Sequence, residues 1–416
     1  MTDPAASAEP IKRQPRAAAT IFVVGTVLID ALAFALILPV LPSLLMDLTG
    51  EGVGGAAFWG GLATFGFALA QFVCSPVIGG LSDRFGRRPV LLASLAALAL
   101  DFLLMGLAHA LWVFFFARLI SGIFAATHST ANAYIADITE PADRARRYGW
   151  LGAAMGAGFI LGPALGGLLG ELSPRAPFFA AAALAGINVV YGFFVVPESL
   201  SKENRRPFSW SRANPVGTLM KLRQVEGVGV LVWVYLFMGL SGFVYPAVWS
   251  YVAIGKFGWS EGQIGASLAY YGVIYVICQA VMVPYVLPRL GQRRAIWIAL
   301  SLEVFALIVL AFAPSGHFVY AILLLALFTG MQDPALMSIM TERVGKDAQG
   351  ELQGGLAALG GVILAIAPLL YTQLFFLFES GAAGFSFAGA PFLVSAGMSA
   401  MALLLFLGRR RVVSTP

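Results

Sequence analysis

Runs of about twenty apolar residues recur along the whole chain. A helix of that length, at ~1.5 Å per residue, reaches across the ~30 Å hydrocarbon core of a bilayer. Hydrophobic residues make up 59% of the chain and charged residues only 11%, well below the charged fraction of a soluble domain. A soluble fold could not bury so much apolar surface, so the sequence predicts an all-α membrane protein.

Twelve such runs can be separated. They lie at 21–41, 58–80, 90–107, 111–136, 148–170 and 178–196, and then at 228–252, 264–287, 295–313, 318–340, 352–378 and 387–407. Their interior glycines and prolines are compatible with helices, because membrane helices tolerate these residues better than soluble helices do. No cleavable signal peptide is expected, since the first 18 residues are polar and the first run is long enough to span.

The basic residues outside these runs lie on one side of the predicted membrane. Of the 26 Lys and Arg residues, only Arg118, Arg175 and Lys256 lie within a run or in a loop of the opposite side. The positive-inside rule therefore predicts that both termini and the central loop are cytoplasmic. The net charge of +5 follows from this topology, so no nucleic-acid partner is expected.

The chain also has a duplicated plan. The longest polar stretch, 197–227, divides the runs six and six. The loop at 79–89 reads GGLSDRFGRRP, and 288–294, PRLGQRR, is a weaker copy; each precedes a run with a central acid, Asp101 or Glu303. Repeated six-helix halves with a substrate site between them are a transporter plan. The predicted parts are a tail at 1–18, halves at 19–196 and 228–408, the linker at 197–227 and a tail at 409–416.

Several of these segments carry a family resemblance. Residues 79–89 resemble the signature loop of the major facilitator superfamily, and 158–167, GFILGPALGG, resemble the antiporter motif of its drug exporters. The chain further resembles the tetracycline/proton antiporters over nearly its full length, more clearly in the first half. The similar stretches are 30–42, 82–90, 117–122, 149–153, 173–179 and 350–354. The resemblance implies the major facilitator fold, with twelve transmembrane helices in two pseudo-symmetric six-helix halves.

Charged residues within the predicted spans include Asp30, Asp101, Arg118 and Glu303. A charge at the bilayer centre costs at least ~2.5–3.5 kcal/mol, so such residues are functional candidates or members of structural pairs. A carboxyl group that is neutral when dry and ionised when wet can carry a proton as access alternates. Arg118 needs a carboxylate partner, and Asp30 is the predicted one. The resemblance implies substrate binding for Asp30 and Asp101, and proton coupling for all four; Glu303 stands where the family has Asp.

Uncharged polar residues complete the predicted binding site. Gln71, Gln279 and Gln353 lie in or near spans, where they hydrogen-bond either a ligand or a neighbouring helix. Each matches a Gln of the tetracycline exporters. Tyr275 stands where some of them have a functional histidine, and a tyrosine cannot carry a proton near neutral pH. Asp333, next to Pro334, has no counterpart in the resemblance, and we expect it near cytoplasmic water.

Two glycine motifs point to moving parts. Gly79, Asp83, Gly86 and Arg87 lie in the first signature loop, where an Asp can pair in one conformation and release in another. The resemblance assigns them to the conformational gate.

In the fifth span, Gly158, Gly162 and Gly166 recur every four residues, beside Pro163 and Gly167. Small residues at this spacing let helices approach closely. The resemblance implies that this motif seals an exporter on its outer side, which favours export over uptake.

The leading hypothesis is a proton-coupled antiporter of the bacterial inner membrane that exports tetracycline or a similar amphiphilic drug. The family carries tetracycline as a chelate with a divalent cation such as Mg, so any metal arrives with the substrate, and no resident metal or cofactor is expected. The partners expected are protons, the drug and membrane lipid, with a monomer as the functional unit. A multidrug or metabolite exporter and an uncoupled facilitator stay as alternatives. An enzyme is not expected, because no nucleophile–base set or phosphate-binding loop is present.

Overall fold

A computed structural model describes residues 16–125, 127–140, 143–208, 217, 220, 222, 227–345, 348–381 and 383–408. Every regular element in these ranges is a helix. Residues 1–15 and 409–416, which make up most of the predicted tails, lie outside the described residues, as does most of the predicted linker beyond residue 208.

The first bundle contains the helices that precede the linker. They are α1 (Arg16–Leu36), α2 (Leu41–Thr49), α3 (Val53–Phe85), α4 (Arg87–Leu107), α5 (Leu111–Phe124), α6 (Thr127–Ile138), α7 (Arg144–Leu172) and α8 (Ala176–Val195). A short 3₁₀ helix, η1 (Lys202–Asn204), lies in the first part of the linker.

The second bundle contains the helices that follow the linker. They are α10 (Gly229–Gly242), α11 (Val244–Phe257), α12 (Glu261–Ile277), the π-helix η2 (Cys278–Val286), α13 (Leu287–Leu290), α14 (Gln292–Phe312), α15 (Gly316–Leu323), α16 (Ala326–Thr329), α17 (Gln332–Arg343), α18 (Gln349–Glu379) and α19 (Ala390–Gly408).

Each predicted apolar run falls on helices. In the described ranges, 10 helical spans are long and apolar enough to cross a membrane, and α1 with α2, bent by 50°, makes up to 11. The bend lies at Pro39 and Pro42, where the missing amide hydrogens interrupt the helix. The fourth run is divided between α5, which is shorter than a full span, and α6. The all-helical membrane fold is thus confirmed, and the count of twelve crossings stays a prediction.

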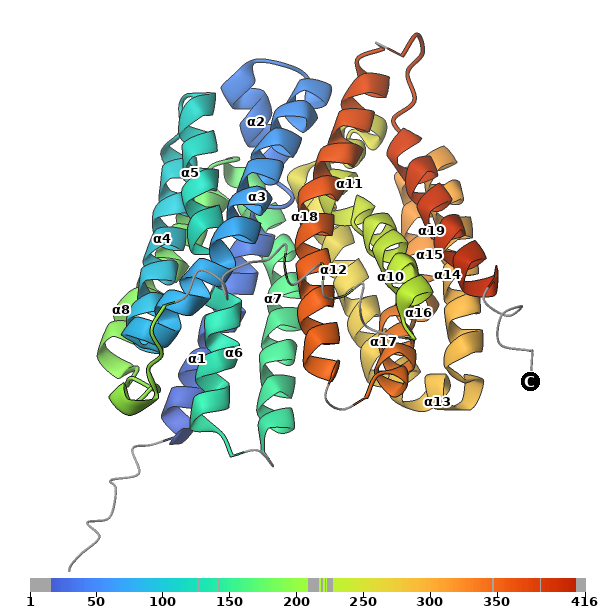
Figure 1. The fold of residues 1–416 in the computed structure, drawn as a ribbon. Helices are drawn as coiled ribbons and strands as arrows, with labels where there is room; N and C mark the ends of the chain where they lie inside the picture. Colours follow the sequence, from blue (N-terminus) through green and yellow to red (C-terminus); the bar gives the residue numbers. More distant parts are fainter. Residues whose placement is uncertain are drawn as a thin grey trace, which may run out of the picture.

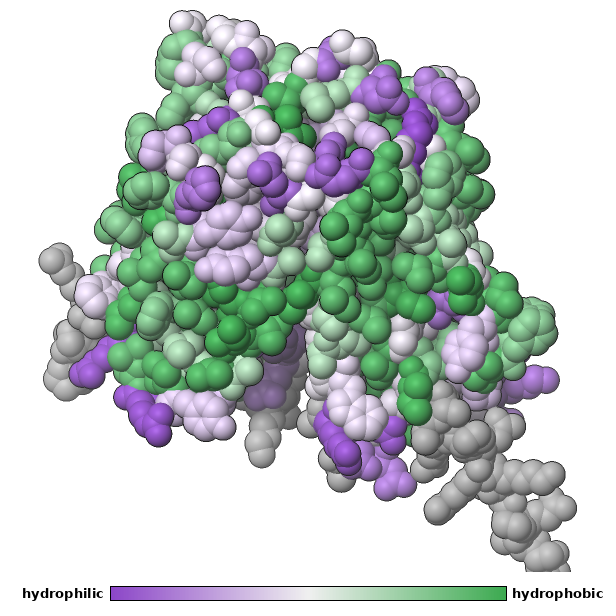
Figure 2. Space-filling model, turned by 180° about the vertical axis from the view of Figure 1, so that it is seen from behind, coloured by the Kyte–Doolittle hydropathy of each residue, from purple (hydrophilic) through white to green (hydrophobic). Residues whose placement is uncertain are grey.

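The two bundles stand side by side, with α3 and α7 of the first packed against α18 and α12 of the second (Figure 1). Large apolar side chains point outward: Leu172, Phe194 and Trp112 are 80%, 79% and 72% exposed. On the face seen in Figure 2, hydrophobic residues form a band between more polar ends. Such a continuous apolar surface would be a liability in water and is what lipid contacts require.

Among the described residues, four hydrogen bonds join the two bundles at one end of the interface that they form. We call this the far end, and the end with the Arg-rich α3–α4 and α13–α14 loops the basic end. The far-end bonds run from Ser43 Oγ to Glu261 Oε1 (2.5 Å), from the Gly262 amide to Glu171 Oε1 (2.9 Å), from Ser250 Oγ to the Leu38 carbonyl (2.8 Å) and from Gln373 Nε2 to the Phe58 carbonyl (3.2 Å). At the lower, basic end, Figure 2 shows a notch between the two bundles. The molecule is therefore closed at the far end.

Candidate functional site

A cavity of about 570 Å³ lies between α7 of the first bundle and α10, α12, α14, α16 and α17 of the second. Its wall extends from Leu38, whose carbonyl is bonded at the far end, to Gly152, about two turns from the basic end of α7. A volume of this size is typical of small-molecule sites. The cavity lies at the interface between the halves, which is where the duplicated sequence predicts a substrate site.

Glu303 of α14 lines the cavity and is only 4% exposed. Its Oε2 atom has no hydrogen-bond partner in the structure. Gln332, at the start of α17, is 8% exposed and also lines the cavity, with its Oε1 atom unpaired. Buried acceptors without a partner cost free energy, so a ligand that donates a hydrogen bond to either atom would remove that cost.

Three tyrosines form a stacked column on the same wall. The rings of Tyr245 and Tyr271 lie 5.8 Å apart at 22°, and those of Tyr271 and Tyr275 lie 6.4 Å apart at 23°. Gln279 Nε2 donates to the Tyr275 hydroxyl at 2.7 Å. Two predicted site residues are therefore in contact, and Tyr275, Glu303 and Pro163 all line this cavity.

Asp101 and Arg118 form a buried ion pair in the first bundle. Asp101 Oδ2 accepts from Arg118 Nη2, and the two residues are 0% and 9% exposed. The prediction that Asp30 pairs with Arg118 is therefore wrong. Asp101 lies six residues before the end of α4, and Arg118 seven residues after the start of α5. Because α4 and α5 form an antiparallel hairpin, these offsets put both side chains ~9–11 Å along their helices from the same turn.

The other predicted binding residues lie outside the residues that line this cavity. Asp30 is half-buried on α1. Gln71 Nε2 donates to the Ala125 carbonyl at 3.2 Å, at the break that follows α5. Gln353 Nε2 lies 3.5 Å from the Met337 sulfur. In this conformation these two glutamines contact neighbouring helices, which was the alternative to ligand binding.

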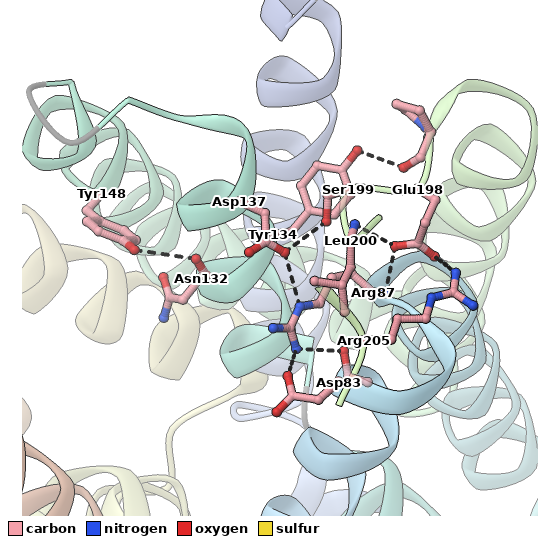
Figure 3. A network of polar contacts seen from close by, with 12 residues as sticks. Asp83, Arg87, Asn132, Tyr134, Asp137, Tyr148, Glu198, Ser199, Leu200 and Arg205 are labelled. Atoms are coloured by element: carbon pink, nitrogen blue, oxygen red, sulfur yellow. Dashed lines mark hydrogen bonds and ion pairs between the residues drawn. The ribbon is translucent and has the colours of Figure 1, made fainter. Parts of the chain in front are cut away.

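Two of the predicted gate residues, Asp83 and Arg87, belong to a polar network at the basic end (Figure 3). Arg87 Nη1 lies 2.6 Å from Asp83 Oδ1, and Arg87 Nε donates to Asp137 Oδ2 at 3.2 Å. Gly86, with φ at +110°, makes the turn in a conformation that side chains rarely adopt. Gly79 lies one α3 turn before Asp83. All of these contacts lie within the first bundle.

The first part of the linker is bound to this network. Glu198 Oε1 accepts from the Arg87 amide at 2.8 Å, and the Arg206 amide donates to the Asp83 carbonyl at 3.1 Å. Sequence reasoning missed Asp137 and Glu198. Their only signal was an acid at a predicted helix end near an arginine-rich loop.

The glycines of α7 face two different helices. A Cβ atom on Gly158 would lie 2.7 Å from the Leu32 amide nitrogen, and one on Gly162 would lie 2.9 Å from the Leu32 carbonyl, both on α1. Gly166 meets α1 at the Leu36 carbonyl. Gly167 instead faces α12, with the Glu261 carbonyl 2.6 Å from its would-be Cβ. The motif thus joins α7 to α1 within its own bundle and to α12 across the far end.

Comparison with known proteins fits this architecture. A model of the Major Facilitator Superfamily matches residues 23–254 and 231–416. The chain belongs to the Major Facilitator Superfamily.

Two relatives narrow its place in the Major Facilitator Superfamily. The chain is 40% identical over 357 residues to the class C tetracycline resistance protein of Escherichia coli, covering 86% of this chain and 89% of the relative. It is 39% identical over 350 residues to the class G protein of Vibrio anguillarum, covering 83% and 88%. The resemblance to tetracycline resistance proteins is thereby confirmed.

Solved structures of the superfamily share the fold. The human organic anion transporter TETRAN is 25% identical, with a TM-score of 0.69 over 95% of this chain and all of that one. A bacterial homologue of the lysosomal transporter Spinster, solved in an inward-facing and unoccupied conformation, has a TM-score of 0.76 at 13% identity, covering 96% and 98%. The second likeness speaks for the fold alone. The superfamily and its fold identify the chain as a membrane transporter.

Proposed function

We propose that this transporter is a proton-coupled antiporter that exports tetracycline, carried as a divalent-cation chelate, or a similar amphiphilic drug. The observation that carries the proposal is the interface cavity, which presents the unpaired Glu303 carboxyl oxygen beside the stacked Tyr271 and Tyr275 rings. The identity with tetracycline resistance proteins supports the drug class. A polycyclic drug offers a flat face for the rings and donors for the carboxyl group.

The two buried acids, Glu303 and Asp101, have different surroundings, which suggests different roles in transport. Glu303 lines the interface cavity, whereas Asp101 is paired with Arg118 inside the other bundle. A proton that arrives at Asp101 would neutralise one partner of this buried pair, leaving the Arg118 guanidinium unbalanced. Such a change alters the relative stability of two conformations. Protons moving inward would then drive the drug outward by alternating access.

The orientation follows from charge. The basic end is proposed to face the cytoplasm and the closed far end the outside of a bacterial inner membrane, with both termini cytoplasmic. In that orientation the conformation seen here takes up drug from the cytoplasm. The monomer is proposed as the functional unit, because each chain contains both bundles and the cavity between them.

Another drug class is the second candidate. Tyr275 stands where some tetracycline exporters have a functional histidine, and the chain is also 32% identical over 288 residues to a protein of Bacillus subtilis named multidrug resistance protein 2. The mechanism would be the same, with a different preferred drug.

Inverted membrane vesicles test both parts of the proposal. An imposed proton gradient should drive uptake of labelled tetracycline above the level of vesicles without the protein, and more strongly with Mg²⁺ than after chelation. The variant Asp101→Asn should lose accumulation, whereas the control Asp143→Asn, at an exposed position before α7, should retain it. Accumulation by Asp101→Asn at the wild-type rate would contradict its coupling role. No uptake of tetracycline, with uptake of another drug, would contradict the substrate.

A further inference from the structure

Asp333 has no part in the coupling scheme, yet it lines the drug cavity. The predicted tenth span is broken twice, between α15 and α16 and again at Gly330 and Met331 before α17. The second break puts Gln332 and Asp333 in the first turn of α17, at the wall of the cavity and well inside the span Gly316–Arg343. Asp333 is exposed there, while its neighbour Gln332 is buried.

The charged residues of the cavity wall are all acidic. Glu303 and Asp333 are its two acids, and no Lys, Arg or His is present among the described residues that line it. The acceptor atoms Glu303 Oε2 and Gln332 Oε1 are buried without a partner. The wall therefore offers acceptors and negative charge, and it lacks the basic groups that an anionic ligand would need.

Aromatic rings supply the rest of the wall. Tyr245, Tyr271 and Tyr275 stack along it, and Phe159 and Phe243 also line the cavity. The faces of such rings attract a cation, and more strongly where water is excluded. Two carboxyl groups beside a tyrosine column thus form a complementary surface for an aromatic compound with a positive charge.

We infer that this cavity selects lipophilic aromatic cations, with Asp333 as the residue that determines this charge specificity. The inference rests on the proposed function, because it takes this cavity to be the drug site. Glu303 is deeply buried and therefore suited to binding both substrate and proton in turn. Asp333, exposed to the open part of the cavity, adds a second negative charge that a cation meets on entry. A neutral or anionic compound of the same shape gains nothing from it.

Equilibrium binding to the purified full-length protein in nanodiscs tests this inference. The probes are tetraphenylphosphonium and tetraphenylborate, which have nearly the same size and shape and opposite charge. Binding to empty nanodiscs is subtracted. The wild-type protein should bind the cation and show little saturable binding of the anion. The variant Asp333→Asn should bind the cation roughly tenfold to a hundredfold more weakly, because it removes the Coulomb attraction between a carboxylate and a cation a few ångströms away.

Two further variants keep the outcome clear. Asp333→Glu preserves the charge and should bind the cation nearly as the wild type does. Asp143→Asn removes an acid remote from the cavity and should change nothing. Cation binding by Asp333→Asn that equals the wild type, or anion binding as tight as cation binding, would overturn the inference.

The two experiments distinguish failure of the charge-selectivity inference from failure of the proposed function. If tetracycline accumulates in vesicles while Asp333→Asn binds the cation normally, the charge inference fails and the proposed function stands. If tetracycline does not accumulate but Asp333→Asn loses cation binding, the drug is wrongly named and the charge selectivity of the cavity holds.

Discussion

Replacing Gly167 by alanine should open the far end of the transporter. The Cβ atom added by Gly167→Ala would lie 2.6 Å from the Glu261 carbonyl oxygen and 3.1 Å from the Cα atoms of Gly262 and Gly265. Ordinary contact begins near 3.4 Å, so the shortest of these is too close by 0.8 Å (3.4 − 2.6). All three atoms belong to backbone of the α12 region, which cannot rotate away as a side chain does. The two bundles must therefore separate locally.

The size of the effect follows from this geometry. Overpacking of a close interface costs about 1–3 kcal/mol. The atoms in conflict belong to the other bundle, so the cost applies only while α7 and α12 are together at the far end. Conformations in which they separate avoid it. The equilibrium should therefore shift toward far-end opening by a factor of roughly 5 to 150.

Thiol labelling measures that shift. Leu38→Cys, in a background of Cys74→Ala and Cys278→Ala, places a thiol on the cavity wall just inside the far-end contacts. An impermeant maleimide added to intact cells should react several-fold faster when Gly167→Ala is also present.

Gly152→Ala is the matched control. It changes a glycine of the same helix, where an added Cβ has nothing within 4 Å, and it should leave the labelling rate unchanged. If Gly167→Ala labels no faster than this control, the far-end contact does not hold the molecule closed and the reasoning is refuted.

Three other outcomes are expected. Gly162→Ala should lower the thermal midpoint of the purified protein, because overpacking against α1 costs about 1–3 kcal/mol. The control Gly149→Ala, where the added Cβ has open space, should leave the midpoint nearly unchanged, and equal midpoints for the two variants would contradict the α1–α7 packing. Arg118→Met should destabilise the protein by about 3–5 kcal/mol, because it leaves the buried Asp101 carboxylate without its cation. Adding Asp101→Asn should restore most of the thermal midpoint, and no recovery would show that the lost ion pair does not cause the destabilisation. Glu198→Ala removes an acceptor of two backbone amides, so trypsin should cut within 200–208 roughly tenfold faster; an unchanged cleavage rate would show that this segment is not held by Glu198.

Hydropathy and charge made the membrane fold predictable, because each apolar run must find lipid or another helix. The bend at the first span was also within reach, since Pro39 and Pro42 stand inside the predicted run. The breaks around α16 were not, because only Gly330 and Pro334 mark them and membrane helices often carry such residues.

Among the contacts of charged residues, one could have been predicted from the sequence and another could not. Counting from the hairpin between α4 and α5 would have matched Arg118 with Asp101, since both lie at similar depth. The contact of Glu198 with the Arg87 amide joins positions 111 residues apart. No local pattern specifies such a contact, because it depends on how α8 packs beside α4.

The eighth predicted span contains the nine-residue π-helix η2, from Cys278 to Val286, with Pro284 inside it. In a π-helix each hydrogen bond joins residue i to residue i+5, one residue further along the chain than in an α-helix. A short π-helical segment therefore contains about one residue more than an α-helical segment that spans the same length. Deleting a single residue there, such as Ala280, would let the segment return to α geometry while α12 and α13 keep their faces. A one-residue deletion elsewhere in a packed span turns every later side chain by about 100°. The π-helix η2 can therefore lose one residue without changing which side chains the flanking helices α12 and α13 present to their neighbours.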